Sequence, residues 1–198
     1  MSKIMYYFST ADRRLRYDDN RHIVCGETHV VDIATRRLVL CAYGLHASPT
    51  PFQALAYAPG PILWQVRLGG EVITGDDKSC ASERTYLAEF DATAVLRTFA
   101  RRQALINIEK IRPCCVPAGY DLILTWLTTG DDSLRSAAWS AAESAARSAA
   151  YAAESAAYAA WSAARSAAYA ARSAAYAAES AAGAMLDEMI REATGWEV

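Results

Sequence analysis

His46 is the histidine of this 198-residue chain that is best placed for chemistry, because it follows Tyr43-Gly44-Leu45 at the end of a strand-like segment. A single histidine in that place is either a hydrogen-bonded turn residue or a ligand-binding or acid–base group. His22 and His29 lie in a polar stretch and indicate no shared metal. The cysteines are odd in number and unevenly spaced, which favours neither a zinc site nor a disulfide framework: Cys25, Cys41, Cys80, Cys114 and Cys115. We therefore predict no metal and no resident cofactor.

A second group of candidate residues lies in the Ala- and Ser-rich segment from 135 to 183, where one large side chain recurs every three or four positions. This spacing places the large side chains along one stripe of a helix. Aromatic faces beside guanidinium groups stack on rings and neutralise anions, or hold another protein surface. We call this stripe the ridge surface and define it by Trp139, Trp161, Arg165, Tyr169 and Arg172. The sequence predicts it as a possible second binding surface.

The elements that position these residues divide the chain in two. Alanine has the highest helix propensity, and neither Pro nor Gly interrupts the segment before Gly183. The sequence predicts one very long Ala-rich helix in the segment 131–198. It is capped at Asp131, Asp132 or Ser133 and continues to Thr194, so it has about 60 residues and a length of about 90 Å. Charged residues and serines recur too often for a membrane span.

The alanine side of this helix is the surface through which we predict that copies of the chain assemble. Small side chains let another backbone approach closely, which favours packing on a second copy of the chain. We therefore predict a homo-oligomer built through the Ala-rich helix, with a solvated spacer as the alternative.

Residues 1–130 predict one α+β domain with a small mixed or antiparallel sheet and helices. Short runs rich in Val, Ile, Tyr and Leu predict strands, each bounded by turn residues: 3–9, 28–33, 37–42, 61–68, 70–74 and 84–90. Helices are predicted from Ser48 to Tyr57, from Asp91 to Ile111 and over 117–129, and Asp76-Asp77-Lys78 predicts a turn.

The net charge limits the kinds of partner that we expect, and the first residues indicate the expected compartment. The formal net charge is -2 and the sequence pI is about 5.9, which gives no support to general nucleic-acid binding. The first residues lack the features of a signal peptide, and no segment predicts membrane insertion. The expected location is the cytoplasm, or the host cytoplasm for a phage-encoded protein.

The segment from Tyr43 to Leu68 resembles part of the ADP-ribosyltransferase fold. The resembling features are Gly44-Leu45-His46-Ala47-Ser48, then Ala54 and Tyr57 on a helix, then a strand from Ile62. In that family the nicotinamide end of NAD is held at this place, and the first strand contributes to the same pocket. The resemblance thus implies a ligand pocket formed by Tyr7, Thr10, Gly44, His46, Ser48 and Tyr57. Neither Glu71 nor Glu83 stands in a recognisable catalytic motif, so we assign no catalytic residue.

The layout of GLHAS, GEVITGDDK and a tail of SAAR and SAAY repeats also resembles a family of uncharacterised bacteriophage accessory proteins. Together these resemblances imply a counter-defence binding protein that sequesters a small nucleotide-derived signal through an oligomeric assembly. Two alternatives stay open: a mono-ADP-ribosyltransferase, and a structural assembly protein whose globular part ends a helical rod.

Overall fold

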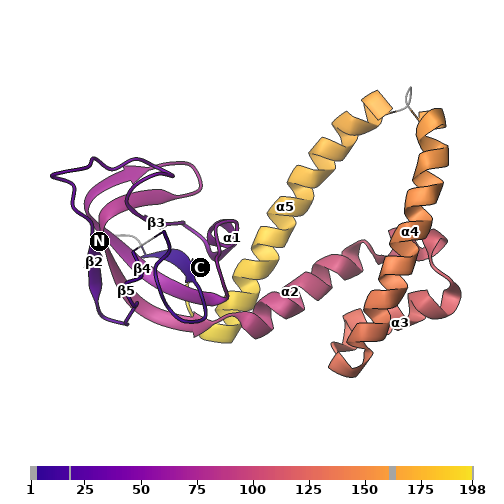
Figure 1. Ribbon diagram of the computed structural model, residues 1–198, viewed down its shortest axis with the longest axis horizontal. Coiled ribbons are helices and arrows are strands. Elements are labelled where there is room, and N and C mark those ends of the chain that lie inside the picture. Colours follow the sequence, from indigo (N-terminus) through magenta and orange to yellow (C-terminus); the bar gives the residue numbers. More distant parts are fainter. Residues whose placement is uncertain (1–3, 18, 161–163, 198) are drawn as a thin grey trace. The chain divides into compact units, whose positions relative to one another are not determined.

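The computed structural model describes residues 4–17, 19–160 and 164–197, without the side chains of residues 152–171 (Figure 1). The chain forms two compact units. The sheet unit combines Met1–Leu96 with Gly183–Val198, and the helical unit consists of Arg97–Ala182. No described helix is both long and apolar enough to cross a membrane.

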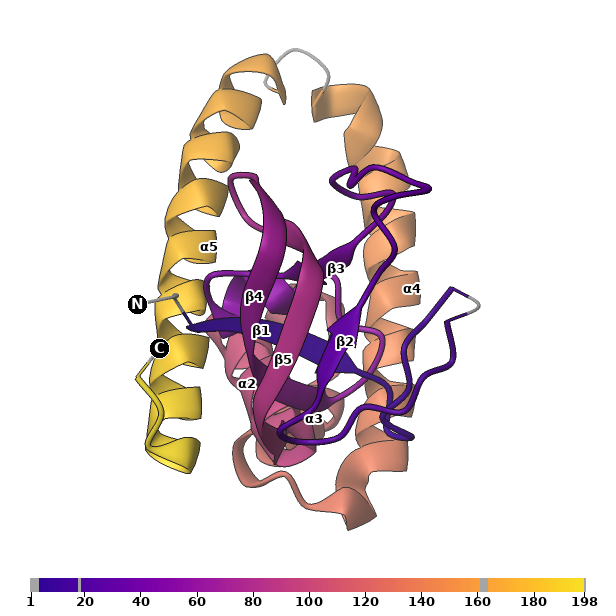
Figure 2. The ribbon, with the colours of Figure 1, turned by 90° about the vertical axis from the view of Figure 1, so that its left-hand side faces the viewer.

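The sheet unit is built on a five-stranded antiparallel sheet. Its two longest strands, β4 (Ile62–Thr74) and β5 (Ser79–Asp91), form a hairpin whose turn is closed by a 2.8 Å hydrogen bond from the Gly75 N–H to the Lys78 carbonyl. Strand β1 (Ile4–Ser9) pairs with β4, while β2 (Thr28–Val30) and β3 (Leu45–Ala47) pair with β5. Figure 2 shows the strong twist between these strands. The turn predicted at Asp76-Asp77-Lys78 is confirmed.

The strands close into a circuit. Tyr6 in β1 exchanges two backbone hydrogen bonds of 2.8 Å with Ser48, the residue after β3. The pairing order is therefore β1–β4–β5–β3 and back to β1. This circuit encloses an apolar core that includes Trp64, Val66 and Tyr86.

The last residues of the chain belong to the same unit. Leu186 and Ile190 are fully buried, and the ring of Trp196 meets that of Phe90 edge to face at 6.3 Å. The Tyr6 hydroxyl donates a 2.7 Å hydrogen bond to the backbone carbonyl of Glu197. Two segments far apart in the sequence thus form one fold.

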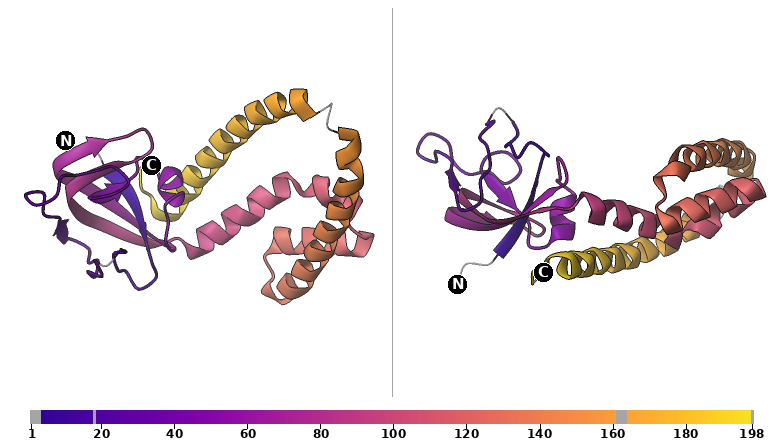
Figure 3. Two further views of the ribbon diagram at one scale, coloured as in Figure 1. Left: turned by 45° about the horizontal axis from the view of Figure 1, so that its top comes forward. Right: turned by 90° about the horizontal axis from the view of Figure 1, so that it is seen from below.

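Helix α1 (Pro51–Leu55) follows β3, and α2 (Thr93–Ile106) follows β5. The helical unit holds η1 (Ile108–Cys114), α3 (Pro117–Thr129), η2 (Asp132–Leu134) and α4 (Arg135–Ala160). Helix α3 packs on α4 through Ile123, Leu127 and Ala138 (Figure 3). The exact bounds predicted for α3 are confirmed, with Pro at its first position and Gly130 in the left-handed conformation at its end.

The prediction of one very long helix is wrong, so the predicted fold class fits only in part. The Ala-rich segment contains two described helices, α4 and α5 (Ala164–Thr194), and residues 161–163 lie outside the described residues. Propensity favours helix at each alanine but does not require one continuous axis. Packing decides instead: α4 buries Ala138 and Ala145 in the helical unit, whereas the end of α5 buries Leu186 and Ile190 in the sheet unit.

Two smaller predictions are also wrong. Residues 37–42 form no strand, because the run is closed into a turn in which Ala42 and Tyr43 both donate to the Val39 carbonyl. The helix predicted from Asp91 to Ile111 ends at Ile106, and η1 follows it.

Candidate functional site

A cavity of about 460 Å³ opens in the sheet unit, between β1, β3, α1 and the loops before β2 and β3. Five of the six residues predicted for a ligand pocket line it: Tyr7, Gly44, His46, Ser48 and Tyr57. Thr10 does not; its hydroxyl donates a 2.5 Å hydrogen bond to Asp12 and shapes the turn after β1. The volume falls in the range of small-molecule sites.

Gly44 and His46 build the turn that forms one wall of this cavity. The Cys41 N–H donates a 3.0 Å hydrogen bond to His46 Nε2, and His46 also bonds the Gly44 backbone. Both ring nitrogens are therefore occupied, with Nε2 as the acceptor. Burial, reinforced by the charges of Arg84 and Lys78, lowers the pKa of His46. Of the two interpretations of His46, these contacts favour the hydrogen-bonded turn residue.

Tyr57 stands at the mouth of the cavity with 47% of its surface exposed. Its hydroxyl donates to the Asp77 carboxylate, and the Lys78 ammonium lies 3.6 Å from the centre of its ring. These contacts fix the position of the Tyr57 side chain relative to the β4–β5 turn. The cation occupies one face of the ring, and stacking of a ligand would use the other face.

Arg84 is one of the cavity residues that the sequence analysis missed, and the one that is both charged and buried. It lies in the middle of β5, is only 2% exposed, and places its guanidinium 3.7 Å from the centre of the Tyr7 ring. Its Nη1 donates to the His46 carbonyl at 2.5 Å, and its Nε and Nη2 both donate to the Tyr86 hydroxyl at 3.1 and 2.7 Å. No described carboxylate forms an ion pair with it.

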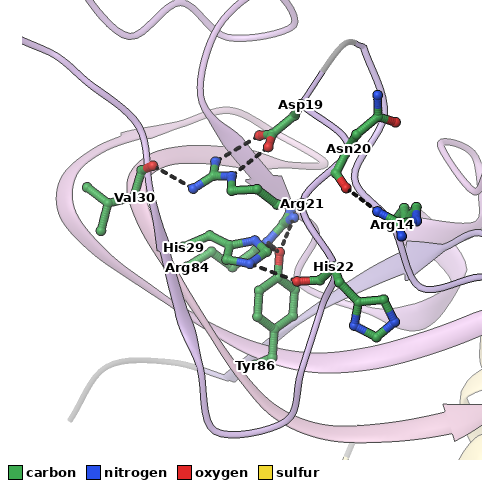
Figure 4. Close-up of polar contacts among 9 residues, drawn as sticks. All are labelled: Arg14, Asp19, Asn20, Arg21, His22, His29, Val30, Arg84 and Tyr86. Carbon is green, nitrogen blue, oxygen red and sulfur yellow. Dashed lines mark hydrogen bonds and ion pairs between the residues drawn. The ribbon is translucent and has the colours of Figure 1, made fainter.

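The Tyr86 hydroxyl extends this contact into a chain that Figure 4 shows. It lies 3.1 Å from His29 Nδ1, and His29 Nε2 lies 3.1 Å from the His22 carbonyl. Because Tyr86 accepts from Arg84, its proton goes to His29 Nδ1, which leaves Nε2 to donate to His22. Burial raises the pKa of Tyr86 and lowers that of His29, so both groups are neutral within this chain.

The loop before β2 forms the opposite wall. Arg21 holds Asp19 through two hydrogen bonds of 2.5 and 2.7 Å and donates to the Val30 carbonyl, while Arg14 donates to the Asn20 carbonyl (Figure 4). The Arg21 guanidinium lowers the pKa of Asp19, which stays ionised. Asp19 is the one acidic residue among the described cavity residues, and its charge is already neutralised.

Positive charge therefore dominates the cavity. Arg16, Arg36, Lys78 and Arg84 all line it. Each of the four also lies over a tyrosine ring, at 3.6 to 5.1 Å from the ring centre. A lining of guanidinium and ammonium groups interleaved with aromatic faces recognises anionic molecules that carry a flat ring.

Neither glutamate considered for catalysis reaches this cavity. Glu83 precedes Arg84 in β5 and so projects from the opposite face of the strand, and Glu71 is exposed within the bulge of β4. Among the described residues, no three His, Cys, Asp or Glu side chains gather as metal ligands.

The ridge surface is described only in part. Trp139 is 73% exposed, and Arg172 is exposed as well. Trp161 lies outside the described residues, and so do the side chains of Arg165 and Tyr169. The binding role of the ridge surface stays a prediction.

Comparison with known proteins gave no match: no protein-family model, no curated protein and no solved structure is similar to this chain. The resemblances to the ADP-ribosyltransferase fold and to bacteriophage accessory proteins therefore stay predictions.

Proposed function

We propose that the cavity of the sheet unit binds a small nucleotide-derived ligand. The observation that carries this proposal is the lining itself, in which four cations and several tyrosine faces surround a single acid that is already paired. Rings stack on tyrosine, and phosphate groups pair with guanidinium and ammonium groups. A nucleotide offers both chemistries in one molecule.

Binding without turnover is the favoured mode. An ADP-ribosyl transfer needs a carboxylate beside the ribose to stabilise its developing positive charge. Among the described residues that line the cavity, Asp19 has the one carboxylate, and Arg21 holds that carboxylate. If the chain acts in a phage-infected cell, as its repeat tail suggests by resemblance, such a pocket would sequester a nucleotide signal of the host.

The test is a thermal-shift panel of NAD, ADP-ribose and cyclic nucleotides, followed by calorimetry on each ligand that raises the melting temperature. A ligand that binds only the folded state stabilises it in proportion to RT ln(1 + [L]/Kd), so 100-fold excess over Kd adds about 2.7 kcal/mol. We expect at least one member of the panel to bind.

Tyr57→Ala is the matched variant, because it removes a ring at the mouth of the cavity without opening the core. We expect its affinity to fall about tenfold, on the scale of one lost stacking contact. Tyr151→Ala serves as the control, since Tyr151 is 76% exposed and lies in α4, outside the cavity. Equal affinity of both variants and the wild type would contradict the proposed site.

The two alternatives predict different results. If the protein converts NAD to nicotinamide, which chromatography detects, the transferase is indicated. No stabilisation by any nucleotide at millimolar concentration would leave the structural assembly protein as the remaining hypothesis.

A further inference from the structure

Arg84 is a positive charge buried without a negative partner. Its side chain is 2% exposed, and its described contacts are a carbonyl, a phenol and two aromatic rings, all uncharged. Buried charges in proteins are normally paired, because removing an ion from water is unfavourable. An uncompensated guanidinium at the wall of an open cavity is typical of a site whose counter-ion is a ligand.

The hydrogen bonds of Arg84 leave part of its donor set available. A guanidinium has five N–H groups, and three of them donate to His46 and Tyr86. The two others, one on Nη1 and one on Nη2, have no acceptor among the described residues. Two N–H groups on neighbouring nitrogens match two oxygens of one phosphate.

The surroundings fix the guanidinium in place. The Tyr7 ring lies against one face of the guanidinium. The Tyr86 hydroxyl is itself held by His29, as Figure 4 shows. A donor pair fixed before binding loses little conformational entropy when the ligand arrives.

We propose that Arg84 is the anion anchor of the cavity, and that the ligand is phosphorylated and places a phosphate group on the two unused N–H groups. This inference rests on the proposed nucleotide-binding function and narrows its ligand class. Lys78, Arg16 and Arg36 line the same cavity, which favours a phosphate with two negative charges over a carboxylate with one.

The experiment compares inorganic phosphate, the four common ribonucleosides and their 5′-monophosphates by thermal shift and calorimetry. For the wild-type protein we expect stabilisation by phosphate alone, and a Kd for at least one monophosphate that is about tenfold or more below that of its nucleoside. We expect Arg84→Met to abolish both effects.

Two further variants keep the test decisive if Arg84→Met does not fold. Tyr86→Phe keeps the ring packed against Trp64 and His29 and removes only the oxygen that positions Arg84, so it should reduce the phosphate effect and leave nucleoside binding unchanged. Arg67→Met is the charge-matched control, because Arg67 is exposed in β4 and absent from the cavity.

The outcomes separate this inference from the function on which it rests. If a nucleoside and its monophosphate bind equally well, or Tyr86→Phe and Arg84→Met keep the full phosphate effect, the anchor is refuted while nucleotide-type binding stands. If phosphate stabilises the protein through Arg84 but no nucleotide improves on it, the anchor stands and the nucleotide function fails. If nothing binds, both fail.

Discussion

At the scale of single residues, the turn from Cys41 to His46 is held in conformations that few side chains adopt. Cys41 has a φ of 69° and Gly44 a φ of 132°. A Cβ at Gly44 would lie 2.9 Å from Leu38 Cδ2 and 3.3 Å from Cys80 Cβ. The sequence analysis placed Gly44 in a ligand pocket, but the atoms that approach it closely are those of the protein's own side chains.

We expect Gly44→Ala to destabilise the sheet unit by about 1–3 kcal/mol, because the backbone strain and the contact with Leu38 act together. Urea unfolding monitored by Trp fluorescence measures this. Gly26→Ala is the matched control: Gly26 also has a positive φ, 88°, but a Cβ there would meet nothing within 4 Å. Equal losses for the two variants would show that the packing around Gly44 contributes little.

His29 and His46 predict how stability depends on pH. Burial holds the pKa of each below the ordinary value of 6.5, so the unfolded chain binds more protons than the folded one between those values. Stability is therefore fully present above pH 6.5 and decreases as the pH falls through that value.

The check is the urea midpoint measured from pH 7.5 down to pH 5. His29→Gln should flatten this decrease, because one of the two depressed groups is removed. A midpoint that stays constant or rises over the same range would contradict the prediction.

The candidate site was partly predictable for a physical reason. Gly44, His46 and Tyr57 belong to one short stretch, and local sequence carries local geometry. Arg84 was missed because a charged residue in a strand is ordinarily taken as solvent-facing. The alternation held a signal: Cys80, Ser82 and Tyr86 share its face, whereas Glu83 and Thr85 occupy the other.

At the scale of elements, the packing of α3 on α4 shows which alanines of α4 are buried. Ala138 and Ala145 are 2% and 5% exposed, while the residues beside them face solvent. Gly119 of α3 lies so close to α4 that an added Cβ would be 3.5 Å from the Ala141 Cβ. One stripe of alanine is thus covered by a helix of the same chain.

We expect Ala145→Leu to destabilise the helical unit by about 1–3 kcal/mol, because the buried stripe has no room for three more carbons. Ala146→Leu, one residue along the same helix and exposed, should change stability by less than about 0.5 kcal/mol. Thermal unfolding followed by circular dichroism at 222 nm compares them. A larger effect at Ala146 would place the covered face elsewhere.

Predictability differed between elements for related reasons. The bounds of α3 follow from Pro117 and Gly130, which act within one turn of the helix ends. The single helix over 131–198 failed because helix propensity is local, whereas packing into two different units decides how the helices are placed in the sequence. The strand over 37–42 failed because an apolar run does not reveal that the backbone closes into a turn on the Val39 carbonyl. The return of residues 183–198 to the sheet unit is likewise a long-range contact.

At the scale of the whole molecule, large side chains on the Ala-rich helices remain uncovered. Trp139, Tyr151 and Tyr176 are 67 to 76% exposed. Large exposed aromatic side chains offer apolar contact area to a partner when they lie together on one surface. The homo-oligomer, predicted through the alanine side, stays a prediction. Because α3 already covers one stripe of the alanines in α4, we now propose its contacts at these exposed aromatic residues.

Light scattering coupled to gel filtration tests this at micromolar concentration. We expect a mass of at least two chains for the wild type, and a lower mass for Trp139→Ser combined with Tyr151→Ser, because the substitutions remove apolar area from the contact. Ile106→Ser is the control, since Ile106 is 64% exposed but lies at the end of α2. A wild-type protein of single-chain mass would refute the oligomer.

The placement of residues 183–198 in the sheet unit also sets an order of events on the ribosome. Strands β1 to β5 are complete at Asp91, but the segment that meets Phe52, Phe90 and Tyr6 begins at Gly183. At about 5–20 residues per second, the nascent sheet waits on the order of ten seconds for this segment. The unit that is translated first is therefore the last to be finished, and its apolar surface is open to chaperones while the helical unit is being made.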